Sequence, residues 1–189
     1  SSVLKAPWLK GIKIGLLGFG LGTNLLLFAQ WFTDPITVAL LATLIPISAT
    51  ILEVWDGRRK LNSRFILGLS ASIIGGFIAV SENISIDLGW GVLMALGSGF
   101  CFMWASDKSV TRLSELSSIA RSSVTFTGAA VFTTISFAVF FTLGLIEIPN
   151  RLSSGQFLSL IIYSVIAMAI SQVFFIAAID KVGTAITSL

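Results

Sequence analysis

The chain of 189 residues is 55% hydrophobic and only 11% charged, and its mean hydropathy is +0.97. Because about 25% of the residues of a soluble domain are charged, this composition indicates a membrane protein. The sequence has no histidine and one cysteine, Cys101, which excludes an intramolecular disulfide and a cysteine metal cluster. No basic stripe marks a nucleic-acid partner. With no histidine and no carboxylate in mid-span, we expect no enzyme activity, no metal and no cofactor.

Six apolar stretches without charge are long enough to cross a bilayer, which takes about 20 residues of helix. They are Ile14–Phe32, Pro35–Leu52, Phe65–Ser81, Leu88–Ser106, Ser122–Ile146 and Phe157–Ile179. A seventh begins near Val182 and is truncated at Leu189. Backbone groups in lipid must be paired within the segment, so we expect helices. The predicted fold is all-α: a polytopic membrane helix bundle of about six full transmembrane helices and part of a seventh.

The basic residues of the loops predict an orientation. If the spans cross alternately, every lysine and arginine except Arg151 lies on one side. That side carries Lys5, Lys10, Lys13, Arg58, Arg59, Lys60, Arg64, Lys108, Arg112, Arg121 and Lys181. By the positive-inside rule this side is cytoplasmic. We therefore expect an integral protein of a bacterial-type inner (plasma) membrane with a cytoplasmic Arg58–Arg64 loop.

The second stretch carries Pro46 deep in its interior. Proline removes the N–H that would bind the carbonyl of Ala42, which membrane helices tolerate where hydroxyl groups or water replace it. Thr43 and Thr50 are nearby candidates for that role. We expect a kink that exposes backbone polarity to a midplane cavity. The same stretch opens with Asp34–Pro35, which predicts a capped helix start.

An internal repeat is visible between the two ends of the chain. Asn24–Leu41 aligns with Gln172–Leu189 without gaps at an offset of 148 residues. Each copy reads as an amide-bearing helix, a tight turn and a helix of small residues. Five spans fall within the period, so the copies have opposite orientations. Inverted repeats are the architecture of many secondary transporters, with substrate bound at the repeat interface.

The run "GTNLLLFAQWFTDPITVALLATLIPISATILEV", followed by a basic loop and "FILGLSASIIGGFIAV", resembles an EamA-type domain of the drug/metabolite transporter superfamily. "LGWGVLMALGSGFCFMWASDKSV" resembles the opening helix of its second repeat, and "FFIAAIDKVGTAITSL" the junction before that repeat's proline helix. The resemblance implies a fragment of a ten-helix fold. Residues 1–81 would be the C-terminal part of the first repeat and residues 88–189 the N-terminal part of the second.

The function that the resemblance implies is secondary transport of amino-acid- or drug-like metabolites by alternating access. The chain departs from the family in one place. Where members commonly carry Gly-Glu-Arg-Leu after the proline helix, this chain has Arg58–Leu61, "RRKL". A role for that loop glutamate is therefore weakened here. Expected partners are the lipid bilayer and a small-molecule solute, with a homodimer left open.

Five residues are candidates for the substrate pathway: Asn24, Thr37, Pro46, Gln172 and Trp104. Amides are costly in lipid and usually face the protein interior, so Asn24 and Gln172 could contact a solute or bond to a neighbouring helix. Trp104 could line a cavity or anchor at the interface. Glu53 could pair with Arg58 or Arg59, or act as a coupling or gating carboxylate.

Small residues at helical spacing predict close contacts between helices. The candidates for this packing are Gly11, Gly15, Gly18, Gly22, Gly75 and Gly76, several of them in GxxxG pairs. The alternative to a transporter is a membrane scaffold or assembly subunit. It would have a tightly packed interior without a polar cavity.

Overall fold

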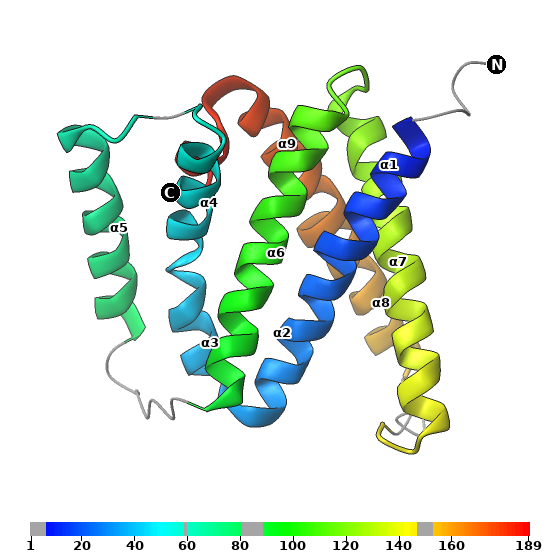
Figure 1. Cartoon of the computed structure of the whole chain (residues 1–189). Helices are drawn as coiled ribbons and strands as arrows, with labels where there is room; N and C mark the ends of the chain where they lie inside the picture. The colour runs from blue at the N-terminus through cyan, green and yellow to red at the C-terminus, as the bar shows by residue number, and fades with distance from the viewer. Residues whose placement is uncertain (1–6, 59, 81–88, 147–152) are drawn as a thin grey trace.

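The computed structural model describes residues 7–58, 60–80, 89–146 and 153–189. The described residues form helices and no strand, which confirms the all-α fold class. Lys5, Arg59 and Arg151 lie outside the described residues, as do parts of both expected repeats. Figure 1 shows long helical rods standing roughly side by side, with α6 in the middle and α5 at one edge.

The helices follow the apolar stretches of the sequence closely. In chain order they are α1 (Pro7–Ile14), η2 (Gly15–Gly20), α2 (Leu21–Phe32), α3 (Pro35–Ala42), α4 (Ile45–Trp55), α5 (Ser63–Val80), α6 (Trp90–Arg112), α7 (Ser118–Thr142), α8 (Ser154–Tyr163), η4 (Ser164–Ile170), α9 (Ser171–Val182) and α10 (Thr184–Thr187). The segments η2 and η4 are π-helical and join their neighbours into continuous rods.

Within the described residues, four rods are long and apolar enough to cross a membrane. They are Pro7–Phe32, Pro35–Trp55, Ser118–Thr142 and Ser154–Val182. The expected count of six spans and part of a seventh is therefore not confirmed. Helix α6 is less apolar because it ends with the charged residues Asp107, Lys108 and Arg112. Small or polar residues earlier in α6 contact its neighbours: Ser98 bonds to Gly22 of α2, and Gly99 lies against Ile45 of α4.

Glycines allow the rod α1–η2–α2 to lie against α6 and α7. A Cβ on Gly15 would overlap the carbonyl oxygen of Thr125 in α7, and one on Gly18 would overlap the Ala105 side chain in α6. A Cβ on Gly11 would overlap Val124, whereas one on Gly22 would lie 3.3 Å from the Cβ of Cys101. These contacts bring backbones close enough for Ser98 Oγ to donate to the Gly22 carbonyl at 2.8 Å.

The glycines of α5 differ from this set. No described atom lies within 4 Å of the position that a Cβ on Gly75 would take, so Gly75 makes no close helix contact in this structure. The reason is the place of α5 at the edge of the bundle, where it contacts α3 and, through Phe65, the core cluster of Ala49, Leu52, Met103 and Ala185. Gly76 belongs to α5, but its surroundings are not described.

The structure breaks the expected kinked helix at Pro46 into two. Helix α3 ends at Ala42, the backbone turns through Thr43 and Leu44, and α4 begins at Ile45. Pro46 thus occupies the first turn of α4, where a missing N–H leaves no bond unmade. Thr43 Oγ1 donates to the Leu40 carbonyl at 2.7 Å, and Thr50 Oγ1 donates to the Pro46 carbonyl at 2.7 Å.

The start of α3 follows the sequence. Asp34 caps the helix, since its Oδ1 accepts the N–H groups of Ile36 and Thr37 at 2.9 Å each, and Pro35 occupies the first turn. The predicted cap is confirmed. The pKa of Asp34 lies below its ordinary value, mainly because the Thr37 hydroxyl donates to the carboxylate and next because the Thr37 N–H does.

The two ends of the chain repeat one order of elements. The π-helical segment η2 precedes α2, and η4 precedes α9; both α-helices have 12 residues. A short link then leads to α3 in one case and α10 in the other. The internal repeat itself remains a prediction, which this shared order of elements favours.

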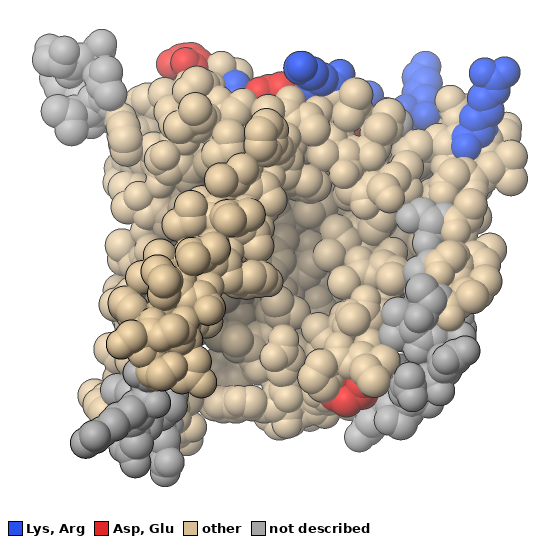
Figure 2. Space-filling model, turned by 180° about the vertical axis from the view of Figure 1, so that it is seen from behind, with Lys and Arg blue, Asp and Glu red and all other residues tan. Residues whose placement is uncertain are grey.

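The described basic residues gather at one end of the bundle. They are Lys10, Lys13, Arg58, Lys60, Arg64, Lys108, Arg112, Arg121 and Lys181. Figure 1 places the start of α1, α5 and α7 and the end of α4, α6 and α9 at this end. In Figure 2 charged side chains line the same rim, and the face below it is hollowed. We call this the basic end.

Candidate functional site

A pocket of about 370 Å³ lies between α2 and α7. Its lining consists of Asn24, Leu27, Phe28, Gln30, Trp31, Thr133, Phe137, Phe140 and Ile146. No charged side chain belongs to this described lining. Its volume lies within the range of small-molecule sites, which are mostly apolar with a few polar groups that orient the ligand. We call it the aromatic pocket.

Asn24 supplies an oriented polar group to the aromatic pocket. Its side chain is buried, with 7% of its surface exposed, and its Nδ2 donates to the Gly20 carbonyl at 2.9 Å. Gly20 ends the π-helical segment η2, whose wider turn alters the regular bonding of the helix. This bond fixes the rotamer of the amide. No described donor binds its Oδ1, which can therefore accept from a ligand.

Aromatic rings form the apolar walls of the pocket. The Phe28 ring meets Trp31 edge-on at 5.2 Å between centroids, and it meets Phe140 of α7 edge-on at 5.1 Å. Such edge-to-face pairs are favourable and hold the rings in defined planes. The pocket thus offers preformed aromatic faces beside the amides of Asn24 and Gln30.

A second, smaller cavity of about 110 Å³ lies beside the break between α3 and α4. Ala42 and Ile45, on either side of the break, face Ser98 and Gly99 of α6 across it. Its lining is nearly all apolar among the described residues. This cavity is small and largely apolar, and Pro46 is buried without lining it, so the polar midplane cavity expected near Pro46 stays a prediction.

The structure does not bring the five predicted pathway residues together. Asn24 lines the aromatic pocket, whereas Thr37 is 2% exposed and its Oγ1 donates to Asp34 Oδ2 at 2.5 Å in the α3 cap. Trp104 lines a different pocket at the basic end. Gln172 lies in α9, and its Nε2 is buried with no hydrogen-bond partner among the described residues.

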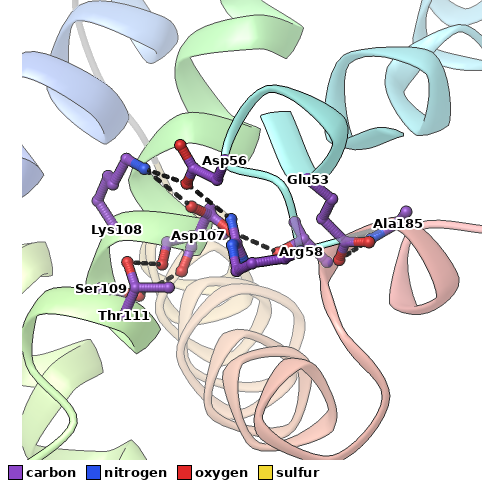
Figure 3. A network of polar contacts seen from close by, with 10 residues as sticks. Glu53, Asp56, Arg58, Asp107, Lys108, Ser109, Thr111 and Ala185 are labelled. Atoms are coloured by element: carbon purple, nitrogen blue, oxygen red, sulfur yellow. Dashed lines mark hydrogen bonds and ion pairs between the residues drawn. The ribbon is translucent and has the colours of Figure 1, made fainter. Parts of the chain in front are cut away.

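At the basic end, Asp107 of α6 lies at the centre of a polar network (Figure 3). Its side chain is 1% exposed. Its Oδ1 accepts from Arg58 Nη2 at 2.6 Å and from Thr184 Oγ1 at 2.9 Å. Because Arg58 follows α4 and Thr184 begins α10, this one carboxylate connects three parts of the fold.

Asp56 extends the network toward the surface. It accepts from Lys108 Nζ at 2.7 Å and from Arg58 Nη2 at 3.0 Å, and about a third of its side chain is exposed. The Lys108 ammonium, and after it the Arg58 guanidinium, hold the pKa of Asp56 below the ordinary value of 3.8. These pairs therefore contribute stability above that value and lose it as the pH falls through the lower folded pKa.

Glu53 of α4 lies beside the same network and binds the start of α10. Its side chain is 3% exposed, and its Oε1 accepts the backbone N–H of Ala185 at 2.9 Å (Figure 3). A carboxylate at the start of the short α10 satisfies a donor that the helix itself leaves unpaired. Of its two expected partners, Arg58 binds Asp56 and Asp107, and Arg59 lies outside the described residues. A gating role for Glu53 stays a prediction.

A second ion pair, between buried Arg121 and exposed Asp180, joins α7 to α9. Arg121 is 5% exposed, and its Nη1 lies 2.7 Å from both carboxylate oxygens of Asp180. Its Nε donates to the Leu113 carbonyl at 2.9 Å and its Nη2 to the Ser114 carbonyl at 3.1 Å. One guanidinium thus fixes both the helix pair and the α6–α7 turn.

Replacing Arg121 with lysine should therefore cost about 2–3 kcal/mol of unfolding free energy, because a single ammonium cannot reach the carboxylate and two carbonyls together. Chemical unfolding in detergent micelles measures it. Lys181→Arg is the control, since Lys181 is exposed and makes no described ion pair. Equal stability of Arg121→Lys and the parent chain would contradict the role assigned to the guanidinium.

Asp107, Arg121 and Asp180 were not predicted from the sequence as residues of a polar network. A signal was available, because Asp107 directly follows the apolar stretch that ends at Ser106. A carboxylate so close to an apolar run is costly unless it is paired. Its partners come from α4 and α10, which are distant in sequence, so the pairing itself could not be foreseen.

Comparisons of the chain with protein-family models, with curated proteins and with solved structures found no significant match. The resemblance to EamA-type transporters therefore stays a hypothesis. Function has to be inferred from the aromatic pocket, the broken helix and the polar network at the basic end.

Proposed function

We propose that this chain is a large part of an integral membrane transporter that moves small, uncharged solutes by alternating access. The apolar rods would cross an inner (plasma) membrane. Helices α5 and α6 would also be spans, and α10 would be the beginning of a seventh span. The basic end would face the cytoplasm, as the positive-inside rule expects. The long apolar surface of α8 and η4, which have no buried residue in this structure, fits a lipid environment.

The observation that carries the proposal is the aromatic pocket. A packed scaffold would not need an oriented amide beside a void of about 370 Å³. Asn24 and Gln30 can orient a solute, and Phe28, Trp31 and Phe140 can stack on it. These features match those of small-molecule sites in general.

The polar network supports alternating access at the opposite end. Asp107, Arg58 and Thr184 join α4, α6 and α10, and Arg121 with Asp180 joins α7 to α9. When helices rotate against each other, ion pairs and hydrogen bonds of this kind can break and re-form with other partners. They can therefore hold one conformation more selectively than apolar packing does. We assign the structure to a state closed at the basic end.

The broken helix and the shared element order also favour transport. Transporter sites are commonly built where helices are discontinuous and where inverted repeats meet. The chain has such a discontinuity at Thr43–Leu44, and π-helical segments precede both α2 and α9. Segments of this kind are frequent at functional sites.

The lining narrows the class of solute. An ammonium or carboxylate group taken out of water needs a charged partner, and no charged side chain belongs to the described lining. Of the amino-acid- and drug-like solutes that the sequence leaves open, an uncharged molecule with an aromatic part fits best. Its hydroxyl or amide N–H would donate to Asn24.

Flux into proteoliposomes tests the proposal with tritiated aromatic solutes, both neutral and zwitterionic. Asn24→Ala should lower the flux of a neutral solute about 3- to 10-fold, the value of one hydrogen bond. Thr133→Val, in the pocket, should lower it less. Thr134→Val is the matched control, because Thr134 is exposed on the same helix and lines no described part of the pocket.

No flux for any solute, together with inaccessible cysteines along Thr23–Gln30, would favour the scaffold alternative. Flux of a zwitterionic solute that depends on Asn24 would support the proposal of transport and contradict the proposal that the solute is uncharged.

A further inference from the structure

A second large pocket, of about 550 Å³, opens between α1 and the end of α6. Lys10, Lys13 and Arg112 supply three cationic side chains to its lining. The remaining lining is apolar or aromatic: Ile14, Leu17 and Trp104. No carboxylate belongs to the described lining, and nothing in the proposed transport function uses this pocket.

The three cations are not engaged in holding the fold together. Lys10, Lys13 and Arg112 form no ion pair or hydrogen bond through their side chains among the described residues. By contrast, Arg58, Lys108 and Arg121 of the same basic end all bind carboxylates. Like charges repel one another when they are gathered around one pocket, so the arrangement is stabilised by an anion between them.

The pocket changes character along the helix axis. Lys10 and Lys13 lie one turn apart on α1, and Leu17 follows another turn further, so all three lie on one side of the rod. Leu17 keeps 53% of its surface exposed, and Trp104 lies beside it in the lining. A site for a soluble anion would not need this exposed apolar wall below the cations.

We infer that this pocket binds the headgroup of an anionic phospholipid, with the phosphate between Lys10, Lys13 and Arg112 and the first part of an acyl chain along Leu17 and Trp104. Basic pockets between helices at the cytoplasmic side of a membrane recognise such headgroups. The inference rests on the membrane placement in the proposed function, with the basic end at an anionic leaflet, and is independent of transport.

Native mass spectrometry of the purified, delipidated chain tests the inference with phosphatidylglycerol and phosphatidylcholine of identical acyl chains. We expect the parent chain to bind phosphatidylglycerol at least roughly tenfold more tightly, because each cation near an anionic surface contributes about fivefold. The variant Lys10→Gln/Lys13→Gln/Arg112→Gln should lose this preference. Where the triple variant fails to fold by circular dichroism, Lys13→Gln alone should weaken binding about fivefold.

The matched control is Lys60→Gln/Arg64→Gln/Lys181→Gln. It removes the same charge from exposed residues of the basic end that line none of the described pockets, and it should keep the preference. Equal binding of the two lipids, or an equal loss in the control, would overturn the inference. Displacement of the lipid by millimolar inorganic phosphate would assign the pocket to a soluble anion instead. Absence of solute flux would leave the lipid result unaffected.

Discussion

Replacing Asp107 with alanine is expected to lower the free energy of unfolding by about 3 kcal/mol, the largest effect of any single side chain in the polar network. The carboxylate is 1% exposed and binds Arg58 at 2.6 Å and Thr184 at 2.9 Å. Its removal leaves the Thr184 hydroxyl without its acceptor and leaves the Arg58 guanidinium and the Lys108 ammonium with Asp56 as their remaining carboxylate. The loss should lie at the lower end for buried pairs, because the Arg58 side chain keeps 36% of its surface exposed.

Denaturant unfolding in micelles, followed by circular dichroism, measures this change. Asp107→Asn should be intermediate, since the amide oxygen still accepts from Thr184 but no longer carries charge. Asp56→Asn is the control, because Asp56 binds the same arginine from a side chain that is 35% exposed. Exposed ion pairs contribute less than about 1 kcal/mol. If Asp107→Ala and Asp56→Asn were equally stable, burial of Asp107 would not have the importance assigned to it.

Helix positions could be predicted from the sequence because lipid-sized apolar runs leave few alternatives. Most of the run that ends at Ser106 lies in α6, and the run from Ser122 lies in α7 as far as Thr142. The extent of each helix could not be predicted, because the predicted apolar stretches end at the first charged residue. Helix α6 continues through Asp107 to Arg112, because Arg58 and Asp56, which follow α4, neutralise the charges of Asp107 and Lys108.

Pro46 illustrates a different limit. The sequence predicts a kink at Pro46, but it does not distinguish a kink from a break between two helices, because both are compatible with the same proline. The structure has a break, since the turn at Thr43–Leu44 lets α4 start afresh with Pro46 where its missing N–H has no cost. Local bonds such as Thr43 Oγ1 to the Leu40 carbonyl then complete the turn.

Asn24 could be identified from the sequence because an amide in an apolar run is rare and costly. Its aromatic neighbours Phe137 and Phe140 could not, because α7 is apolar around most of its circumference and periodicity does not select a face. The sequence likewise does not show which pocket Trp104 lines. Its residue type suits a cavity, but its place on α6 brings it to the basic end.

Replacing Gly15 with alanine should be among the most damaging small substitutions in the chain. A Cβ there would overlap the carbonyl oxygen of Thr125, which belongs to the backbone of α7 and cannot move aside as a side chain can. The two rods would have to separate. Overpacking costs typically about 1–3 kcal/mol, and we expect the upper end of that range or more. Gly128→Ala should act alike, since its Cβ would overlap the carbonyl oxygen of Ile12.

Gly68→Ala provides the opposite case. No described atom lies within 4 Å of its Cβ position in α5, so only helix propensity changes, in favour of alanine by up to about 1 kcal/mol. Unfolding in micelles should therefore show a lower free energy of unfolding for Gly15→Ala and Gly128→Ala and no decrease for Gly68→Ala. Equal stability of Gly15→Ala and Gly68→Ala would show that α7 does not approach the α1–η2 rod this closely. The spacing of glycines in the sequence predicts close contact, but only a neighbouring backbone makes a glycine irreplaceable.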